Sequence, residues 1–365
     1  MPSVLHVLPH PGGGAETYID LLEALPGYRH ERVALSLTRS RRRGVLSVLK
    51  RRREILRRAG DFDLVHVHGD MAAMLAAPPL AGRALLITSH GLHRLRRSHG
   101  AAGWLVRRRL TAAVAASSRT ICIARDERAD LAAALPPALH ERLAVVPNGV
   151  PVPDPVEPAR RAELRQRLGL AETAVAVLFA AQLEARKDPL GAIAAVRAAR
   201  RRGAELVLLL AGSGPLAAEV AAAAGDPAGG GEVRVLGQRP DLEELYAAAD
   251  VFLLPSRREG MSFALLEAMA HGLAVVVADG PGNRETVAEA GAVFPAGDRG
   301  AMAARLAELA ADPAARERLG GAARERIRAE LSAERFLDGT RAQYEAALAA
   351  APLRAPGRGA GAAPV

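Results

Sequence analysis

The sequence predicts an α/β protein made of two doubly wound domains in tandem, each with a parallel sheet. Short runs of Val, Leu and Ile alternate with helical patterns, the alternation pauses at a proline-rich stretch, and it then starts again. Continuous apolar runs separated by helices are typical of parallel strands that are covered on both faces. A length of 365 residues also favours two domains over one.

Residues 1–150 form the first expected domain. Its strands are Val4–Leu8, Arg32–Leu37, Leu64–His68, Ala84–Ser89, Arg119–Ile123 and Leu143–Val146, and its helices include Ala15–Ala24, Val45–Arg58, Gly103–Ala116 and Ala124–Leu135. Pro151, Pro153, Pro155 and Pro158 then predict a stiff, extended linker over residues 151–158.

Residues 159–350 form the second expected domain. Its strands are Val175–Ala181, Leu206–Ala211, Val233–Leu236, Val251–Leu254, Ala274–Val277 and Ala292–Phe294. After residue 299 only helix is expected, to about Ala350, and the Pro, Gly and Ala composition of 351–365 predicts a disordered tail. Two such domains would bind ligands in a cleft at the carboxyl ends of their strands.

Composition excludes several classes of protein. No apolar run approaches the roughly 18 residues that a membrane-spanning helix needs, and no leader pattern precedes the first strand, so we expect a cytoplasmic protein. The single cysteine, Cys122, excludes an internal disulfide framework and is expected to be buried. Aromatic residues make up only 3% and no recognition motif occurs, which argues against nucleic acid as a partner.

The formal net charge of +9 comes from the first 150 residues. The stretch Arg39–Arg58 interleaves cations with apolar residues and contains one acid, Glu54. A second basic set comprises Arg94, Arg96, Arg97, Arg107, Arg108 and Arg109. Such a surface could contact anionic lipid headgroups at the inner membrane face, bind an acidic acceptor, or simply be solvated.

The richest motif runs from Asp250 to Glu285. A strand ends at Pro255, the loop SRREGM follows, and a helix is expected to begin near Ser262, a good N-cap residue. The free amides of Phe263 and Ala264 would then suit a phosphate or diphosphate.

Two glutamates belong to the same motif. Glu267 is the single acid of the apolar helix, and a ribose diol would satisfy its carboxylate. Glu259 lies in the loop, where it could accept hydrogen bonds from sugar hydroxyls. The structural alternatives are an ion pair between Glu267 and an arginine, and a solvated Glu259.

Other candidates are weaker when each is taken alone. Lys187 follows a strand in a chain that uses arginine almost everywhere, and its ammonium would suit a diphosphate, although a solvated lysine is the ordinary alternative. Three glycines, Gly12–Gly14, and the strand-end His90 also have simple structural explanations. His66 and His68 alternate on one strand, but without a third ligand they make a poor zinc site.

Several blocks, in order and spacing, resemble retaining glycosyltransferases of family 4 (glycosyltransferases group 1). The quoted segments are PSRREGMSFALLEAMAHGLAVVVAD, VLFAAQLEARKDPLGAIAAV, LLLAGSGPL and VRVLGQRPDLEELYAAADVFLLP, with PGGGAETYIDLL, DLVHVHGD, ITSHGLH, ICIARDERADL and VVPNGV in the first half and LAELAADPAARERLGGAARERI near the end. The resemblance covers essentially residues 3–350 and implies the GT-B fold, two Rossmann-like domains facing across a cleft.

The resemblance also implies roles for named residues. Catalytic positions are His90, Lys187 and Glu259. Donor-binding positions are Gly13, Gly14, Gln182, Arg186, Lys187, Gly212, Gly214, Glu259, Gly260, Met261, Ser262, Phe263, Ala264 and Glu267. Acceptor-binding positions are Gly14, Glu16, His90 and Asn148. The donor would be a nucleotide-diphosphate sugar, with no metal and no other cofactor.

The chain departs from the family at Gln182, where the family has a second phosphate-binding cation; Arg186 is a candidate substitute. Two alternative functions therefore stay open: a nucleotide-sugar 2-epimerase on the same fold, and a nucleotide-sugar-binding module without catalysis. A phosphorylase ranks low because neither lysine is placed to carry its Schiff-base cofactor. The donor nucleotide and sugar, the acceptor and the oligomeric state do not follow from the sequence.

Overall fold

The computed structural model describes residues 1–35, 45–225 and 231–351, and for 45–48 the backbone only. The chain divides into two compact units. The first contains Met1–Cys122, Arg128–Val145 and Gly339–Val365, and the second contains Ile123–Glu127 and Val146–Asp338. The expected boundary near residue 150 lies close to this division, but the chain from Gly339 onward groups with the first unit. The expected disordered tail, except for Ala351, and residues 39–44 of the expected basic stretch lie outside the described residues.

The first unit is a six-stranded parallel sheet in the order β2-β1-β3-β4-β5-β6. Its strands are β1 (Ser3–Leu8), β2 (Arg29–Ala34), β3 (Leu64–His68), β4 (Leu85–Thr88), β5 (Arg119–Cys122) and β6 (Leu143–Val145). Its helices are α1 (Gly14–Leu22), α2 (Val45–Arg58), η1 (Ala59–Asp61), α3 (Asp70–Ala76), η2 (Pro78–Leu80), α4 (His93–Arg97), α5 (Gly100–Ala116) and η3 (Pro137–Arg142), with parts of α6 (Arg125–Ala134) and α15 (Ala333–Ala350). The strand that the sequence predicts over 32–37 begins at Arg29 in the structure. Its first residues are polar because β2 is an edge strand, so a search for apolar runs does not find them.

Alternation along β1 and β3 gives the first sheet two different faces. Val65 and Val67 join an apolar core that includes residues of α2, α3 and α5. His66 and His68 point to the opposite face, where the buried aromatic residues Tyr18 of α1 and Tyr344 of α15 contact them. Successive side chains of a strand point to opposite faces, so one strand can contribute to both environments.

The second unit is also a six-stranded parallel sheet, in the order β12-β11-β10-β7-β8-β9. Its strands are β7 (Val175–Ala180), β8 (Leu206–Ala211), β9 (Val233–Gly237), β10 (Val251–Leu254), β11 (Ala274–Ala278) and β12 (Ala292–Phe294). Its helices are α7 (Pro158–Arg167), η4 (Ala185–Lys187), α8 (Pro189–Arg200), α9 (Ala217–Ala224), α10 (Leu242–Ala248), α11 (Phe263–Ala270), α12 (Asn283–Val287), α13 (Arg299–Ala311) and α14 (Pro313–Glu330).

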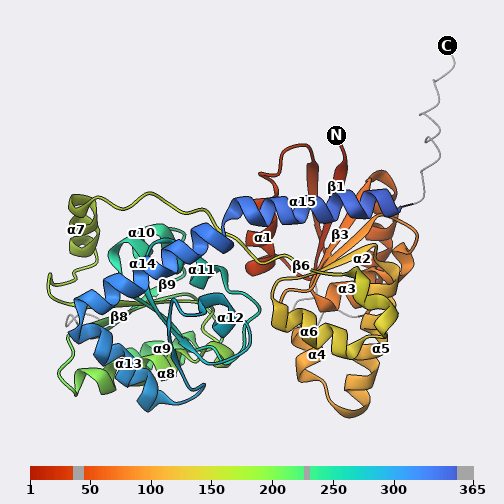
Figure 1. Ribbon diagram of the computed structural model, residues 1–365. Helices are drawn as coiled ribbons and strands as arrows, with labels where there is room; N and C mark the ends of the chain where they lie inside the picture. Colours follow the sequence, from red (N-terminus) through yellow and green to blue (C-terminus); the bar gives the residue numbers. More distant parts are fainter. Residues whose placement is uncertain (36–44, 226–230, 352–365) are drawn as a thin grey trace. The chain divides into compact units, whose positions relative to one another are not determined.

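Helices cover both faces of this second sheet (Figure 1). The core on one face joins the sheet to α8, α9 and α13, while α10, α11 and α14 lie against the other face. Read from β9, the strand order is that of a Rossmann sheet. The chain adds β8 and β9 on one side of β7, and β10, β11 and β12 on the other side, so the order of strand addition reverses between β7 and β10. Ligands of such sheets bind beyond the carboxyl ends of the two strands at this switch point. The predicted fold class is therefore confirmed.

Candidate functional site

The switch point of the second sheet brings Lys187 and Glu259 together. Lys187 ends η4, shortly after β7, and Glu259 lies in the loop after β10. Lys187 Nζ lies 2.5 Å from Glu259 Oε1, and both side chains are buried. Arg186 NH1 lies 3.2 Å from both carboxylate oxygens of Glu259. Neither Lys187 nor Glu259 is therefore solvated, so the two alternatives that the sequence left open for them do not apply.

Charge keeps this buried pair ionised. Burial lowers the pKa of Lys187, and the facing carboxylate of Glu259 opposes that shift. Burial acts to raise the pKa of Glu259, but Lys187 and Arg186 outweigh it, so this pKa is lowered. Ser256 Oγ donates a further hydrogen bond to Glu259. Because a buried cation is costly without a partner, Lys187 needs Glu259 or an anionic ligand in its place.

Helix α11 begins beside this loop with free backbone amides. Its first bond runs from Leu266 N to Ser262 O, at 3.1 Å, and the described residues offer no acceptor to the amides of Phe263 and Ala264. Ser262 is the N-cap residue, which confirms the expected start of the helix, but its side chain makes no capping hydrogen bond. Free amides and the helix dipole together favour an anion at this end.

Glu267 lies on α11 with a tyrosine as its partner. Tyr246 OH, from α10, donates to Glu267 Oε2 at 2.9 Å, and in the described part of the chain no arginine pairs with this carboxylate. Burial raises the pKa of Glu267, while the hydrogen bond from Tyr246 acts to lower it. The second oxygen, Oε1, makes no hydrogen bond within the described residues and remains available to a ligand hydroxyl.

The loop after β8 requires glycine because it packs tightly against the loop after β7. Gly212 and Gly214 have φ of 149° and 159°. A Cβ atom at Gly212 would collide with the carbonyl of Ala181, and one at Gly214 would meet the carbonyl of Leu183 at 2.6 Å. Gln182 lies between these two carbonyl residues, with an exposed side chain. The predicted donor roles of Gly212, Gly214 and Gln182 remain predictions.

In the first unit, the glycine loop after β1 is closed by Glu16. Gly12 and Gly13 have φ of 86° and 83°, and α1 begins at Gly14. Gly12 N donates to Glu16 Oε2 at 2.7 Å. A Cβ atom at Gly12 or Gly13 would meet nothing within 4 Å, so the loop is open on that side. Glu16 therefore has a structural role in holding the loop, beside its predicted role toward an acceptor.

His90 follows β4 in a strained backbone conformation. Its φ is 51°, a value that costs a residue other than glycine roughly 1–3 kcal/mol and that is concentrated at functional sites. His90 Nε2 lies 3.0 Å from His68 Nδ1. Burial, with a smaller effect of His93, lowers the pKa of His90 to about 3. The imidazole is therefore neutral at physiological pH and acts as a hydrogen-bonding group.

A third histidine, which the sequence pattern does not predict, joins His66 and His68 on the same face of the first sheet. His6 of β1 lies opposite His66 in the strand register, and ligand atoms of His6, His66 and His68 all lie within 4.8 Å of one another. The third ligand that seemed lacking for His66 and His68 is therefore present. Only the pairing of β1 with β3 reveals it, although the alternation of histidine and valine in β3 was a visible signal.

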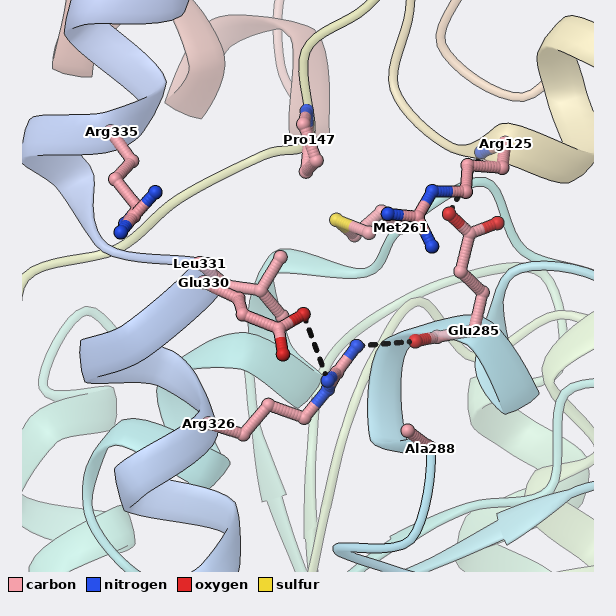
Figure 2. A pocket seen from close by; sticks show the side chains of 9 residues that line it. All are labelled: Arg125, Pro147, Met261, Glu285, Ala288, Arg326, Glu330, Leu331 and Arg335. Carbon is pink, nitrogen blue, oxygen red and sulfur yellow. Dashed lines mark hydrogen bonds and ion pairs between the residues drawn. The ribbon is translucent and has the colours of Figure 1, made fainter.

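A pocket of about 660 Å³ lies in the second unit (Figure 2). It is lined by Arg125, Pro147, Met261, Glu285, Ala288, Arg326, Glu330, Leu331 and Arg335. Among these, only Met261 was a predicted site residue. Arg326 donates to the Glu285 carbonyl and to the Glu330 carboxylate, and both distances are 3.0 Å. Figure 2 marks both bonds. Asn148 Nδ2 donates to Met261 O at 2.9 Å, so Asn148 supports the loop that leads into α11.

Comparisons with known proteins identify the family. Residues 5–152 match Glycosyltransferase Family 4, and residues 160–326 match Glycosyl transferases group 1. The D-inositol 3-phosphate glycosyltransferase of Xylanimonas cellulosilytica is 32% identical over 292 residues, which are 75% of this chain and 69% of that protein. The putative glycosyltransferase EpsD of Bacillus subtilis is 27% identical over 271 residues, 71% of this chain and 70% of that protein.

Solved structures agree on the fold. Anabaena HepE in complex with UDP-glucose has a TM-score of 0.79 at 18% identity, over 94% of this chain and 100% of that chain. WaaG, a glycosyltransferase involved in lipopolysaccharide biosynthesis, has a TM-score of 0.71 at 18% identity, over 93% and 98%. The family matches, together with the fold, define a nucleotide-sugar glycosyltransferase. The chain belongs to glycosyltransferase family 4, the glycosyltransferases group 1, with the GT-B fold.

Proposed function

We propose that this enzyme transfers a hexosyl group from a nucleotide-diphosphate sugar to a hydroxyl acceptor with retention of configuration. The observation that supports the proposal most directly is the switch point of the second sheet, where a buried lysine pairs with Glu259 in the loop that leads to the free amides of α11. These positive groups would stabilise the charge that develops on a diphosphate leaving group. They would do so without a metal ion, and metal-independent transfer is part of the proposal.

The second unit would bind the donor. Lys187 would exchange its carboxylate partner for the diphosphate, and Glu259 would then accept hydrogen bonds from the sugar hydroxyls. The free oxygen of Glu267 would accept a bond from the ribose. Arg186, which faces Glu259 beside Lys187, would supply the second cation that Gln182 lacks. The backbone of residues 260–264 and of Gly212 and Gly214 would line the diphosphate and sugar.

The first unit would bind the acceptor. Gly13 and Gly14 offer backbone at an open loop, and His90 of the same unit offers a neutral ring. Glu16, and Asn148 of the second unit, would support acceptor binding, although both already bond within the protein. The relatives include a mannosyltransferase whose name specifies a monoacylated phosphatidylinositol mannoside. A lipid-linked or polysaccharide acceptor is therefore the class that we propose.

Contact with an anionic membrane would suit such an acceptor. On α5, Trp104 and Leu105 are 57% and 47% exposed, next to the exposed Arg107, Arg108 and Arg109. The Arg108 guanidinium lies 5.5 Å from the centre of the Trp104 ring. Exposed apolar residues among cations are typical of helices that lie on a membrane surface. Among the described helices, none is long and apolar enough to cross a bilayer.

A thermal-shift panel of UDP-, GDP-, ADP- and TDP-sugars tests the donor site. One donor should stabilise the wild type, and Lys187→Met should abolish that shift because the diphosphate loses its buried cation. Lys50→Met, which removes an exposed lysine of α2, is the matched control and should keep the shift. If no donor shifts the wild type, with or without candidate acceptors, the donor site as proposed is wrong.

Two further assays separate the alternatives. Conversion of the donor without an acceptor would favour an epimerase, and donor binding without turnover by any acceptor would favour a binding module. For the membrane, co-sedimentation with phosphatidylglycerol vesicles should exceed that with phosphatidylcholine vesicles. The change Trp104→Ala with Leu105→Ala should weaken it, whereas Val235→Ala, at an exposed residue of the second unit, should not. Equal sedimentation of all three proteins would contradict the proposed surface.

A further inference from the structure

Four histidines of the first unit form one continuous hydrogen-bonded chain. His30 Nδ1 lies 2.9 Å from His6 Nε2, and His6 Nδ1 lies 2.9 Å from His68 Nε2. His68 Nδ1 lies 3.0 Å from His90 Nε2. The chain thus runs through the buried rings of His6 and His68 and ends at the predicted catalytic residue. Neighbouring ring centres lie 5.2–5.3 Å apart and their planes are within 30°, as expected for rings that are joined edge to edge by N–H···N hydrogen bonds.

A neutral imidazole has one N–H donor and one acceptor nitrogen, so the direction of a single hydrogen bond in the chain fixes all the others. Burial lowers the pKa of His6, His68 and His90, and also that of the half-buried His30. The rings are therefore neutral, and only two chain directions exist. In one direction hydrogen stands on Nδ1 of every ring, and in the other it stands on Nε2.

The far end of the chain selects between these directions. His30 Nε2 is buried and has no hydrogen-bond partner among the described residues. A buried N–H without an acceptor is rarer in proteins than an acceptor that lacks a donor, so His30 keeps its hydrogen on Nδ1. His30 then donates to His6, His6 donates to His68, and His68 donates to His90 Nε2. A protonated His30 would donate in the same direction.

We propose that His30, His6 and His68 are positioning residues, which hold His90 as the tautomer with its hydrogen on Nδ1. His90 Nδ1 makes no hydrogen bond within the described residues, and His90 is a partly exposed residue that follows β4. It therefore offers an N–H donor to an oxygen of the bound sugar or acceptor. This inference rests on the proposed glycosyl transfer only for the identity of that oxygen.

The nearby His66 is not part of the chain. Its two nitrogens bond to Tyr344 OH at 3.0 Å and to Thr88 Oγ1 at 2.7 Å. A metal held by His6, His66 and His68 would have to break the bond between His6 and His68 and one bond of His66. The observed hydrogen bonds therefore favour the chain over a metal site, and metal content becomes an outcome of the test.

Position 30 allows a matched pair of variants, because the terminal atoms of Asn and Asp overlie His Nδ1. The His30→Asn side chain can donate to His6 and should keep the direction of the chain. The His30→Asp carboxylate can only accept, so it should reverse the chain and move the hydrogen of His90 to Nε2. In long-range ¹H–¹⁵N spectra of histidine-labelled protein, assigned with His90→Gln, the two tautomers give different patterns.

The expected result is a His90 hydrogen on Nδ1 in the wild type and in His30→Asn, and on Nε2 in His30→Asp. Release of nucleoside diphosphate from UDP-glucose, GDP-mannose or ADP-glucose should fall about tenfold in kcat for His30→Asp and less than about threefold for His30→Asn. A wild-type His90 with hydrogen on Nε2, or one equivalent of bound transition metal in the purified protein, would overturn the inference.

The remaining outcomes are also decisive. A tautomer switch with equal kcat in the two variants would overturn the positioning role. If His30→Asp does not fold, the tautomer of His90 in the wild type and the kcat of His30→Asn still test the inference. If the wild type turns over no donor, the proposed function fails, while the tautomer spectra still test the chain.

Discussion

Acid should unfold the first unit before the second, because the first unit buries neutral histidines. His6, His66 and His68 are fully buried, and burial lowers each pKa well below 6.5. Below pH 6.5 the histidines of the unfolded chain therefore bind protons, whereas the same histidines in the folded unit do not. The free energy of unfolding of the first unit consequently falls as the pH falls. At pH 5, which is 1.5 units below 6.5, a histidine that stays neutral in the folded unit costs at most about 2 kcal/mol, which gives a limit of about 6 kcal/mol for the three. That sum is comparable to the total stability of many domains.

The change His66→Gln tests this magnitude, because Gln can keep the bond to Thr88 but does not titrate. The loss of unfolding free energy between pH 8 and pH 5 should shrink by about 2 kcal/mol, whatever the variant costs in packing at pH 8. Urea unfolding followed by Trp104 measures it, since this single tryptophan belongs to the first unit. His99→Gln, at an exposed site, should lose as much as the wild type. An unchanged pH dependence in His66→Gln would refute the reasoning.

Three other changes probe the second unit by calorimetry. Lys187→Met should destabilise the donor-free enzyme by about 2 kcal/mol. This is less than the 3–5 kcal/mol typical of a broken buried ion pair, because Arg186 still faces Glu259. Adding Glu259→Gln to the same chain should restore part of the lost stability. Because the pKa of Glu267 is raised, its ionised form lowers the stability of the folded enzyme above pH 4.5 but not below it. The change Glu267→Gln should therefore raise the melting temperature at pH 7 but not at pH 4, and it should abolish stabilisation by the donor. An equal rise at both pH values would contradict this. Gly214→Ala should cost about 1–3 kcal/mol because its Cβ meets a backbone carbonyl, whereas Gly321→Ala, where a Cβ meets nothing within 4 Å, should cost nothing.

The fold could be predicted from the sequence because its strands are local and apolar. Runs such as Leu64–His68 and Leu206–Ala211 have the same bounds in the sequence analysis and in the structure. The polar edge strand β2 was misplaced, and the grouping of the end of α15 with the first unit was not foreseen. Both depend on pairing between distant segments, for which a single sequence has no periodic signal.

The candidate site follows the same rule. The motif after β10 could be predicted because its loop, helix start and two glutamates are contiguous. The partner of each glutamate could not be predicted, because it is distant in the sequence. Tyr246 is 21 residues from Glu267, and Lys187 is 72 residues from Glu259. The histidine chain was missed for this reason as well: it joins β2, β1, β3 and the end of β4, and each link depends on strand register.

Both units accept unfavourable features close to their strands. The second buries a lysine against a carboxylate, and the first buries a row of imidazoles that ends at a residue with positive φ. An apolar core of similar volume would be equally or more stable in either place. A requirement for stability alone therefore does not explain these residues. The two proposed roles would explain them: Lys187 as the cation that receives the diphosphate, and His90 as a directed N–H donor.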